Sequence, residues 1–73
     1  MRGYIHTVYR GGQWFNDVEQ VERGSQAYPT KDHAVAAGRL KAKAARTEHV
    51  VHNMDGTIAY RNSYGNDPER SRG

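Results

Sequence analysis

The chain has 73 residues, no cysteine and a formal net charge of +3 at pH 7. A chain of this length forms one small domain that buries only about 60% of the surface its unfolded state exposes, and the absence of cysteine excludes disulfides and thiolate metal sites. The first ten residues contain no apolar run long enough for a signal peptide or a membrane span, so we expect a cytoplasmic protein with no membrane partner. The mild positive charge permits nucleic acid or an acidic protein as a partner without requiring either.

The first part of the chain predicts a β-hairpin. Residues 4–9 are aromatic and β-branched, Gly11 and Gly12 supply a tight turn, and residues 14–21 resume as a second strand. Alternation along the second strand favours Trp14 and Val18 as the inward pair, with Asn16 inward or at an edge. Phe15 would then lie on a second, partly exposed apolar face.

A helix is predicted after a polar loop at residues 22–29. Thr30 can cap its N-terminus, Asp32 favours its first turn, and residues 31–46 are rich in alanine and free of proline. Its apolar side carries mostly Ala and Gly, which allows close approach to a sheet but leaves most of the core to the sheet's own side chains.

A basic row is predicted on the opposite side of this helix. Arg39, Lys43 and Arg46 are spaced at i, i+4 and i+7. Such a row could bind nucleic acid through phosphates, although a solvated helix face gives the same pattern. Any of the five tyrosines could add a stacking surface for bases, but in a chain so poor in Leu and Phe we expect them in the core.

The stretch at residues 48–61 predicts a second hairpin, which organises the fold. Asp55 and Gly56 lie between two β-rich runs, and this pair is a strong hairpin signal because both turn residues must tolerate positive φ. A loop of even length would place Val51 with Ile58 and Tyr60 on one face, whereas a bulged three-residue loop would pair Val50 and His52 with Ile58 and Tyr60.

This second hairpin and the residues after it also carry a resemblance to a known family. The matching residues form a Val-Val-His, Asp-Gly-x-Ile and Ser-Tyr-Gly-x-Asp-Pro series: Val50, Val51, His52, Asp55, Gly56, Ile58, Ser63, Tyr64, Gly65, Asp67 and Pro68. The series resembles the small bacterial domain-of-unknown-function family 2188, and Trp14, Thr30 and Ala34 extend the likeness upstream. The chain departs from the family two residues after Trp14, where it has Asn16 instead of a small or β-branched apolar residue. The resemblance implies a fold and a bacterial or phage context, and it supplies no activity.

The polar segment that follows the hairpin is open to two interpretations. Tyr64 either folds back onto the sheet beside a turn at Gly65 and Asn66, or it forms part of a binding loop. We expect the domain to cover residues 1–68, with a flexible tail at residues 69–73.

The sequence predicts neither a metal site nor an enzyme. The four histidines lack the spacings that zinc sites use, and the acids lie at expected turns or solvent faces, so we expect no catalytic residues, no metal and no cofactor.

We therefore predict an α+β domain of order β-β-α-β-β, with a four-stranded antiparallel sheet and one helix packed on one face. The expected function is a non-enzymatic bacterial or phage module that binds nucleic acid or a nucleoprotein complex through Arg39, Lys43, Arg46 and Tyr64. One alternative is a protein-interaction or inhibitor domain of the mobile-element type that docks by a sheet edge or open face, and another is a structural accessory protein without a ligand. A homodimer is expected because the core is thin.

Overall fold

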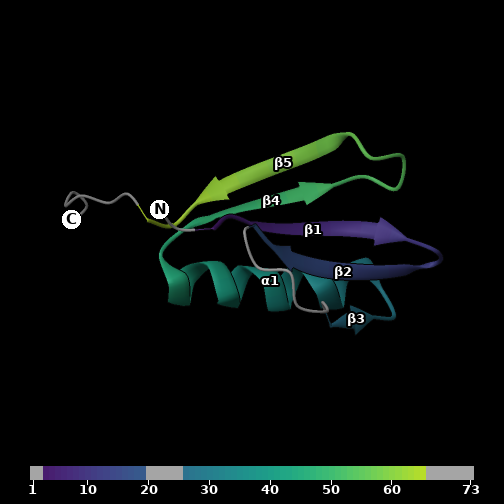
Figure 1. The fold of residues 1–73 in the computed structure, drawn as a ribbon, viewed down its shortest axis with the longest axis horizontal. Helices are drawn as coiled ribbons and strands as arrows, with labels where there is room; N and C mark the ends of the chain where they lie inside the picture. Colours follow the sequence, from purple (N-terminus) through teal and green to yellow (C-terminus); the bar gives the residue numbers. More distant parts are fainter. Residues whose placement is uncertain (1–2, 20–25, 66–73) are drawn as a thin grey trace.

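The computed structural model describes residues 3–19 and 26–65 (Figure 1). One helix, α1 (Lys31–Ala45), packs against a five-stranded sheet. The strands are β1 (Ile5–Arg10), β2 (Gln13–Val18), β3 (Ala27–Tyr28), β4 (Glu48–His52) and β5 (Ile58–Ser63). The predicted α+β class with a single helix is confirmed.

The sheet is mixed, with the strand order β3-β2-β1-β4-β5. Both hairpins are antiparallel as predicted, but β1 and β4 pair in parallel, so the prediction of four antiparallel strands was wrong. The short strand β3 explains the difference. It pairs antiparallel with β2, which is itself antiparallel to β1, so β3 runs in the same direction as β1. A helical crossover then returns the chain to the sheet in a parallel direction.

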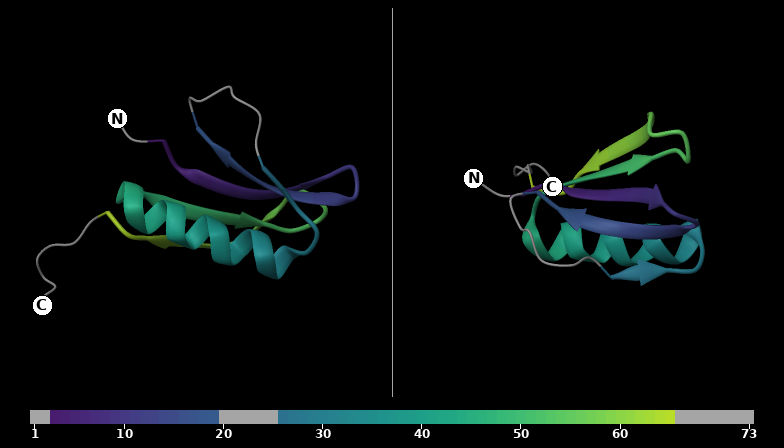
Figure 2. Two further views of the ribbon diagram at one scale, coloured as in Figure 1. Left: turned by 90° about the horizontal axis from the view of Figure 1, so that it is seen from below. Right: turned by 45° about the vertical axis from the view of Figure 1, so that its right-hand side comes forward.

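The helix covers only part of one sheet face. It packs on β1, β2, β3 and β4, and Figure 2 shows the β4–β5 hairpin extending away from it. Every residue of β5 is exposed. The edge strand β5 therefore presents both its backbone edge and its helix-side face to solvent.

Local signals set the helix boundaries. The Thr30 hydroxyl accepts a hydrogen bond from the backbone N–H of His33 at 3.2 Å, which confirms the predicted N-cap. The helix ends one residue earlier than predicted, at Ala45, because Arg46 adopts a left-handed conformation with φ of 56° and its N–H bonds back to Lys43 and Ala42 carbonyls.

The two hairpin turns differ. Gly11 and Gly12 both have positive φ, at 56° and 87°, as the first tight turn requires. In the second turn only Gly56 has positive φ, so the expectation that Asp55 would share it was wrong. Asp55 instead accepts hydrogen bonds from the Thr57 backbone N–H and hydroxyl at 3.0 and 2.7 Å, and these bonds lower the pKa of its carboxyl.

The second hairpin follows neither predicted register in full. Val51 pairs with Tyr60 on the helix side, whereas His52 pairs with Ile58 on the opposite side, because a bulge separates the two pairs. Val50 and Val51 are both buried, although they point to opposite faces of the sheet.

The apolar part of the core is small. The largest apolar side chains that the first two strands contribute are Ile5 on β1 and Trp14 on β2, and the helix contributes Ala34 and Ala42. Val18, predicted to point inward with Trp14, lies on the same helix side but is only half-buried, while Phe15 lies on the opposite face as predicted.

A polar cluster lies at the centre of the core. Thr7, Asn16 and His49 are all buried, and the Thr7 hydroxyl donates to Asn16 Oδ1 at 2.5 Å while lying 2.7 Å from His49 Nε2. Asn16 also donates to the Ala34 carbonyl at 2.8 Å, and Gly38 lies directly above the three side chains. The departure of this chain from the family pattern at Asn16 thus has a structural role, because its side chain joins the sheet to the helix.

The predicted loop and tail fall only partly within the described residues. Residues 27–28 of the expected loop form β3. Residues 20–25, which include the predicted end of the second strand, lie outside the description, as do residues 66–73 with the predicted flexible tail.

Candidate nucleic-acid interface

Two residues of the predicted basic row, Arg39 and Lys43, lie on the helix flank that faces β5 and Tyr64. Arg39, Lys43 and Arg46 are exposed, and the Lys43 ammonium lies 5.7 Å from the centre of the Tyr64 ring. Arg39 and Lys43 therefore lie on a flank of the helix rather than on the side directly opposite the sheet. Arg46 lies beyond the last helical residue in a left-handed conformation, so the prediction that it continues the helical row was wrong. The structure thus brings together two of the four predicted site residues, one from the helix and one from the segment that follows β5.

A hollow of about 430 Å³ continues this flank toward the start of the helix. Arg39 and Tyr60 line it from the helix and from β5, and the remaining lining residues are Lys31, Asp32, Val35 and Ala36. Asp32 adds a negative charge near the helix N-terminus. Lys31 and Asp32 have opposite charges, so the excess positive charge of this flank lies toward Arg39 and Lys43.

Tyr64 is held in place by the end of the helix. Its backbone N–H donates to the Thr47 carbonyl at 3.1 Å, and a Cβ placed on Gly65 would overlap the carbonyl oxygen of Arg46. Only glycine permits this close approach. The close approach at Gly65 therefore keeps the half-buried Tyr64 ring beside Lys43 of the helix.

The tyrosines do not form the core, which contradicts the expectation from composition. Tyr4 and Tyr60 are 40% and 45% exposed, and Tyr9, Tyr28 and Tyr64 are half-buried. The polar cluster of Thr7, Asn16 and His49 occupies the space instead. Tyr60 was missed as a site residue because only its pairing with Val51 shows that it points to the helix side of β5.

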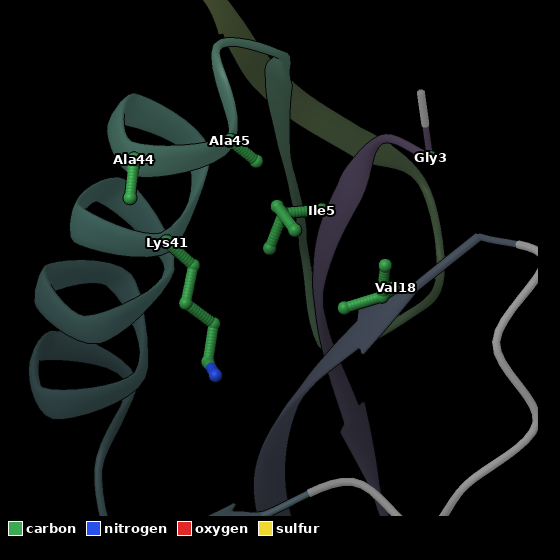
Figure 3. A pocket seen from close by; sticks show the side chains of 6 residues that line it. All are labelled: Gly3, Ile5, Val18, Lys41, Ala44 and Ala45. Atoms are coloured by element: carbon green, nitrogen blue, oxygen red, sulfur yellow. The ribbon is translucent and has the colours of Figure 1, made fainter. Parts of the chain in front are cut away.

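A second hollow, of about 490 Å³, lies on the other flank of the helix. Figure 3 shows Lys41, Ala44 and Ala45 on its helix side and Ile5 and Val18 on its strand side. Lys41 lies at the margin of the apolar side of the helix. Because the residues that follow Glu19 lie outside the description, we assign no ligand to this hollow.

The sheet face opposite the helix carries a row of polar contacts that sequence reasoning missed. His6 Nδ1 lies 3.0 Å from His52 Nε2, and His6 Nε2 lies 2.6 Å from the Glu19 carboxylate. This contact lowers the pKa of Glu19, chiefly through the hydrogen bond to His6. The residues are far apart in sequence, and only the parallel pairing of β1 with β4 brings the two histidines together.

Charged pairs flank the histidines on the same face. Arg10 contacts Asp17 at 2.7 Å and lies over the Phe15 ring at 4.4 Å, and this contact with Asp17 raises the pKa of Arg10. On the other side, Arg61 lies 3.7 Å from Glu48. These pairs leave the face close to neutral around a partly apolar centre.

His49 is the buried titratable group nearest to the basic flank. Burial lowers its pKa most, and the positive charge of Arg39 and then His6 lower it further. A neutral His49 suits its place in the polar core, where its Nε2–H can donate to Thr7.

The described residues contain neither a cluster of three or more metal ligands nor a membrane-spanning helix. Within residues 3–19 and 26–65, no group of three or more His, Cys, Asp or Glu side chains is arranged to hold a metal ion. No helix in the same part of the chain is long and apolar enough to cross a membrane.

Fold and surface together define a small α+β domain with a basic, tyrosine-bearing groove between its helix and its edge strand. The chain belongs to the family described as "Uncharacterized protein conserved in bacteria (DUF2188)", whose model matches residues 5–64. This match confirms the resemblance read from the second hairpin and Trp14. The searches of curated proteins and of solved structures found no match.

Proposed function

We propose that this domain is a non-enzymatic module that binds nucleic acid, alone or within a nucleoprotein complex, through the groove between α1 and β5. The observation that carries the proposal is the placement of the Lys43 ammonium 5.7 Å from the Tyr64 ring, on the same flank as Arg39 and the exposed Tyr60. Cations contact phosphates, and aromatic rings stack on bases.

The geometry of the groove favours single strands over duplexes. Tyr60 and Tyr64 are four residues apart along one edge, which is about 13 Å at strand spacing. The exposed ring of Tyr60 and the accessible part of the Tyr64 ring can stack on unpaired bases, whereas duplex bases are already stacked on one another. We therefore expect single-stranded oligonucleotides to bind more tightly than duplexes of the same length.

Fluorescence anisotropy with labelled oligonucleotides tests this proposal. The variant Arg39→Gln/Lys43→Gln removes two groove charges, and Lys41→Gln/Arg10→Gln is a matched control that removes two charges elsewhere. If both groove side chains contact phosphates, the slope of log K against log salt falls in magnitude by about 1.4 for single strands in the groove variant and stays unchanged in the control. Equal losses of oligonucleotide affinity in the two variants, or no binding by the wild type below about 100 μM, would refute the proposal that nucleic acid binds in the groove.

A second candidate function rests on the exposed edge strand. All six residues of β5 are exposed and its outer edge has no partner strand in the described sheet, so β5 could pair with a strand of another protein, as in an interaction or inhibitor domain. A second copy of the chain is one such partner and would give the homodimer expected from the thin core. Backbone pairing of this kind depends little on salt, in contrast to phosphate binding, and sedimentation equilibrium at tens of micromolar tests the dimer.

The setting of this function is part of the same proposal. We infer a cytoplasmic module of a bacterium or its phage that acts without catalysis. The family's description as conserved in bacteria supports the host range.

A further inference from the structure

We propose that His6 and His52 form a two-histidine site for a first-row transition-metal ion such as Zn²⁺ on the sheet face opposite the helix. His6 Nδ1 and His52 Nε2 lie 3.0 Å apart. Two nitrogens that bind one tetrahedral zinc at 2.0–2.1 Å lie about 3.3 Å apart. The two side chains are therefore within a few tenths of an ångström of the separation that a shared ion requires.

Glu19 supports this arrangement from the other side of the His6 ring. Its carboxylate accepts a hydrogen bond from His6 Nε2 at 2.6 Å, which assigns a ring proton to Nε2 and leaves Nδ1, the nitrogen 3.0 Å from His52, available as a ligand. Metal-binding histidines commonly donate their second ring N–H to a carboxylate in this way, which fixes the tautomer and raises the basicity of the ligating nitrogen. The side chains of His6 and Glu19 are 25% and 42% exposed, so an ion can reach the site.

Backbone pairing holds the site rigid. His6 pairs with Val50 across the parallel β1–β4 contact, and His52 lies two residues further along β4 on the same face. The imidazole rings are 5.2 Å apart between centres and tilted by 36°. Because both Cα positions belong to adjacent strands, little ordering is needed when an ion binds, and the remaining coordination positions would hold water or a ligand from outside the chain.

The charges on this face are compatible with a cation. Glu19 contacts His6 directly, and both arginines of the face lie near acids, Arg10 at Asp17 and Arg61 at Glu48. A metal ion binds an imidazole through an unprotonated ring nitrogen, so protons compete with the ion for these ligands. Two imidazole ligands favour Cu²⁺, Ni²⁺ and Zn²⁺ over Mg²⁺, which prefers oxygen ligands.

Calorimetric titration of the full chain, prepared without a polyhistidine tag, with Zn²⁺ and with Mg²⁺ tests the site. We expect saturable binding of one Zn²⁺ per chain and no binding of Mg²⁺. Glu19→Gln should weaken Zn²⁺ binding by about 10–100-fold, and His6→Gln or His52→Gln should weaken it further. The matched control is His33→Gln, because His33 lies on the first turn of the helix and contacts Thr30 instead, and it should bind as the wild type does.

A second measurement on the unaltered chain avoids any folding defect of the variants. In NMR spectra of the histidine ring protons, added Zn²⁺ should shift or broaden the signals of His6 and His52 while those of His33 and His49 stay in place. Equal Zn²⁺ affinity in the wild type and His52→Gln, or signal changes centred on His33, would show that the His6–His52 contact is only an imidazole hydrogen bond.

Discussion

Replacing Gly38 with alanine should destabilise the protein, against the usual preference of helices. In an exposed helix interior this change stabilises by about 0.8–1 kcal/mol. Here a Cβ on Gly38 would lie 2.6 Å from His49 Nε2, 2.7 Å from Asn16 Oδ1 and 3.0 Å from Thr7 Oγ1. These three atoms form the buried polar cluster, so the added methyl group would push apart partners that have no alternative in the core.

Two unfavourable effects oppose the gain in helix propensity. Overpacking of a core typically costs about 1–3 kcal/mol, and separating a buried hydrogen-bonded pair costs about 1–3 kcal/mol for each group left without a partner. After the propensity gain, the free energy of unfolding should fall by about 1–5 kcal/mol. In a domain of this size each 1 kcal/mol lowers the melting temperature by about 4–8 °C.

Thermal and urea denaturation followed by circular dichroism measure this effect. Ala36→Gly is the matched control, because Ala36 is exposed on the same helix and reports the propensity alone, with an expected loss of about 1 kcal/mol. If Gly38→Ala were as stable as the wild type or more stable, the helix would not press on the polar cluster and the explanation of Gly38 would be wrong.

Three further substitutions test particular contacts by the same denaturation measurements. Arg46→Gly should be more stable than Arg46→Ala by about 1 kcal/mol, because both lose the side chain but only glycine adopts φ of 56° without strain; equal stabilities would contradict the left-handed helix end. Gly65→Ala should destabilise, since its Cβ would overlap the Arg46 carbonyl, and it should also weaken oligonucleotide binding, because the neighbouring Tyr64 would shift away from Lys43; an unchanged melting temperature would show that this approach is not close. Thr7→Val keeps the shape but removes the hydroxyl that joins Asn16 to His49, so it should cost about 1–3 kcal/mol, whereas the exposed Thr57→Val should cost less.

The parts of the fold that could be predicted from sequence are those set by local signals. Gly11-Gly12 determines the first turn, Thr30 the start of the helix, and alternation around Trp14 the inward face of β2, because each signal acts within a few residues. The parallel β1–β4 pairing could not be predicted, since it depends on a two-residue strand that leaves almost no trace in the sequence. A pattern of two hairpins around one helix is compatible with either a parallel or an antiparallel pairing of β1 and β4 until β3 is known.

The candidate groove was predictable in part for the same reason. Helical spacing placed Arg39 and Lys43 in one row of α1, because periodicity is a local property of the chain, but Arg46 lies beyond the end of the helix in a left-handed conformation. The spacing did not show that this row faces β5, where Lys43 meets Tyr64 and where Tyr60 joins the surface. The contact between His6 and His52 was not predictable at all, because 46 residues separate the two side chains.

The groove and the polar core are linked through Arg39 and His49, and this link makes a last prediction. The pKa of His49 is lowered by burial and by Arg39, so the unfolded state binds a proton more readily than the folded state does. The stability contributed by neutral His49 is therefore complete above the unfolded pKa of about 6.5 and is lost as the pH falls toward the lower folded value. Arg39→Gln removes the second cause of the shift, so the NMR-titrated pKa of His49 should rise and the loss of stability as the pH falls below about 6.5 should become smaller. Lys41→Gln, on the other flank of the helix, should leave both unchanged, and an equal response to the two substitutions would show that Arg39 does not act on His49. A phosphate bound at Arg39 would act in the same direction as Arg39→Gln, which makes the pKa of His49 a reporter of whether the groove is occupied.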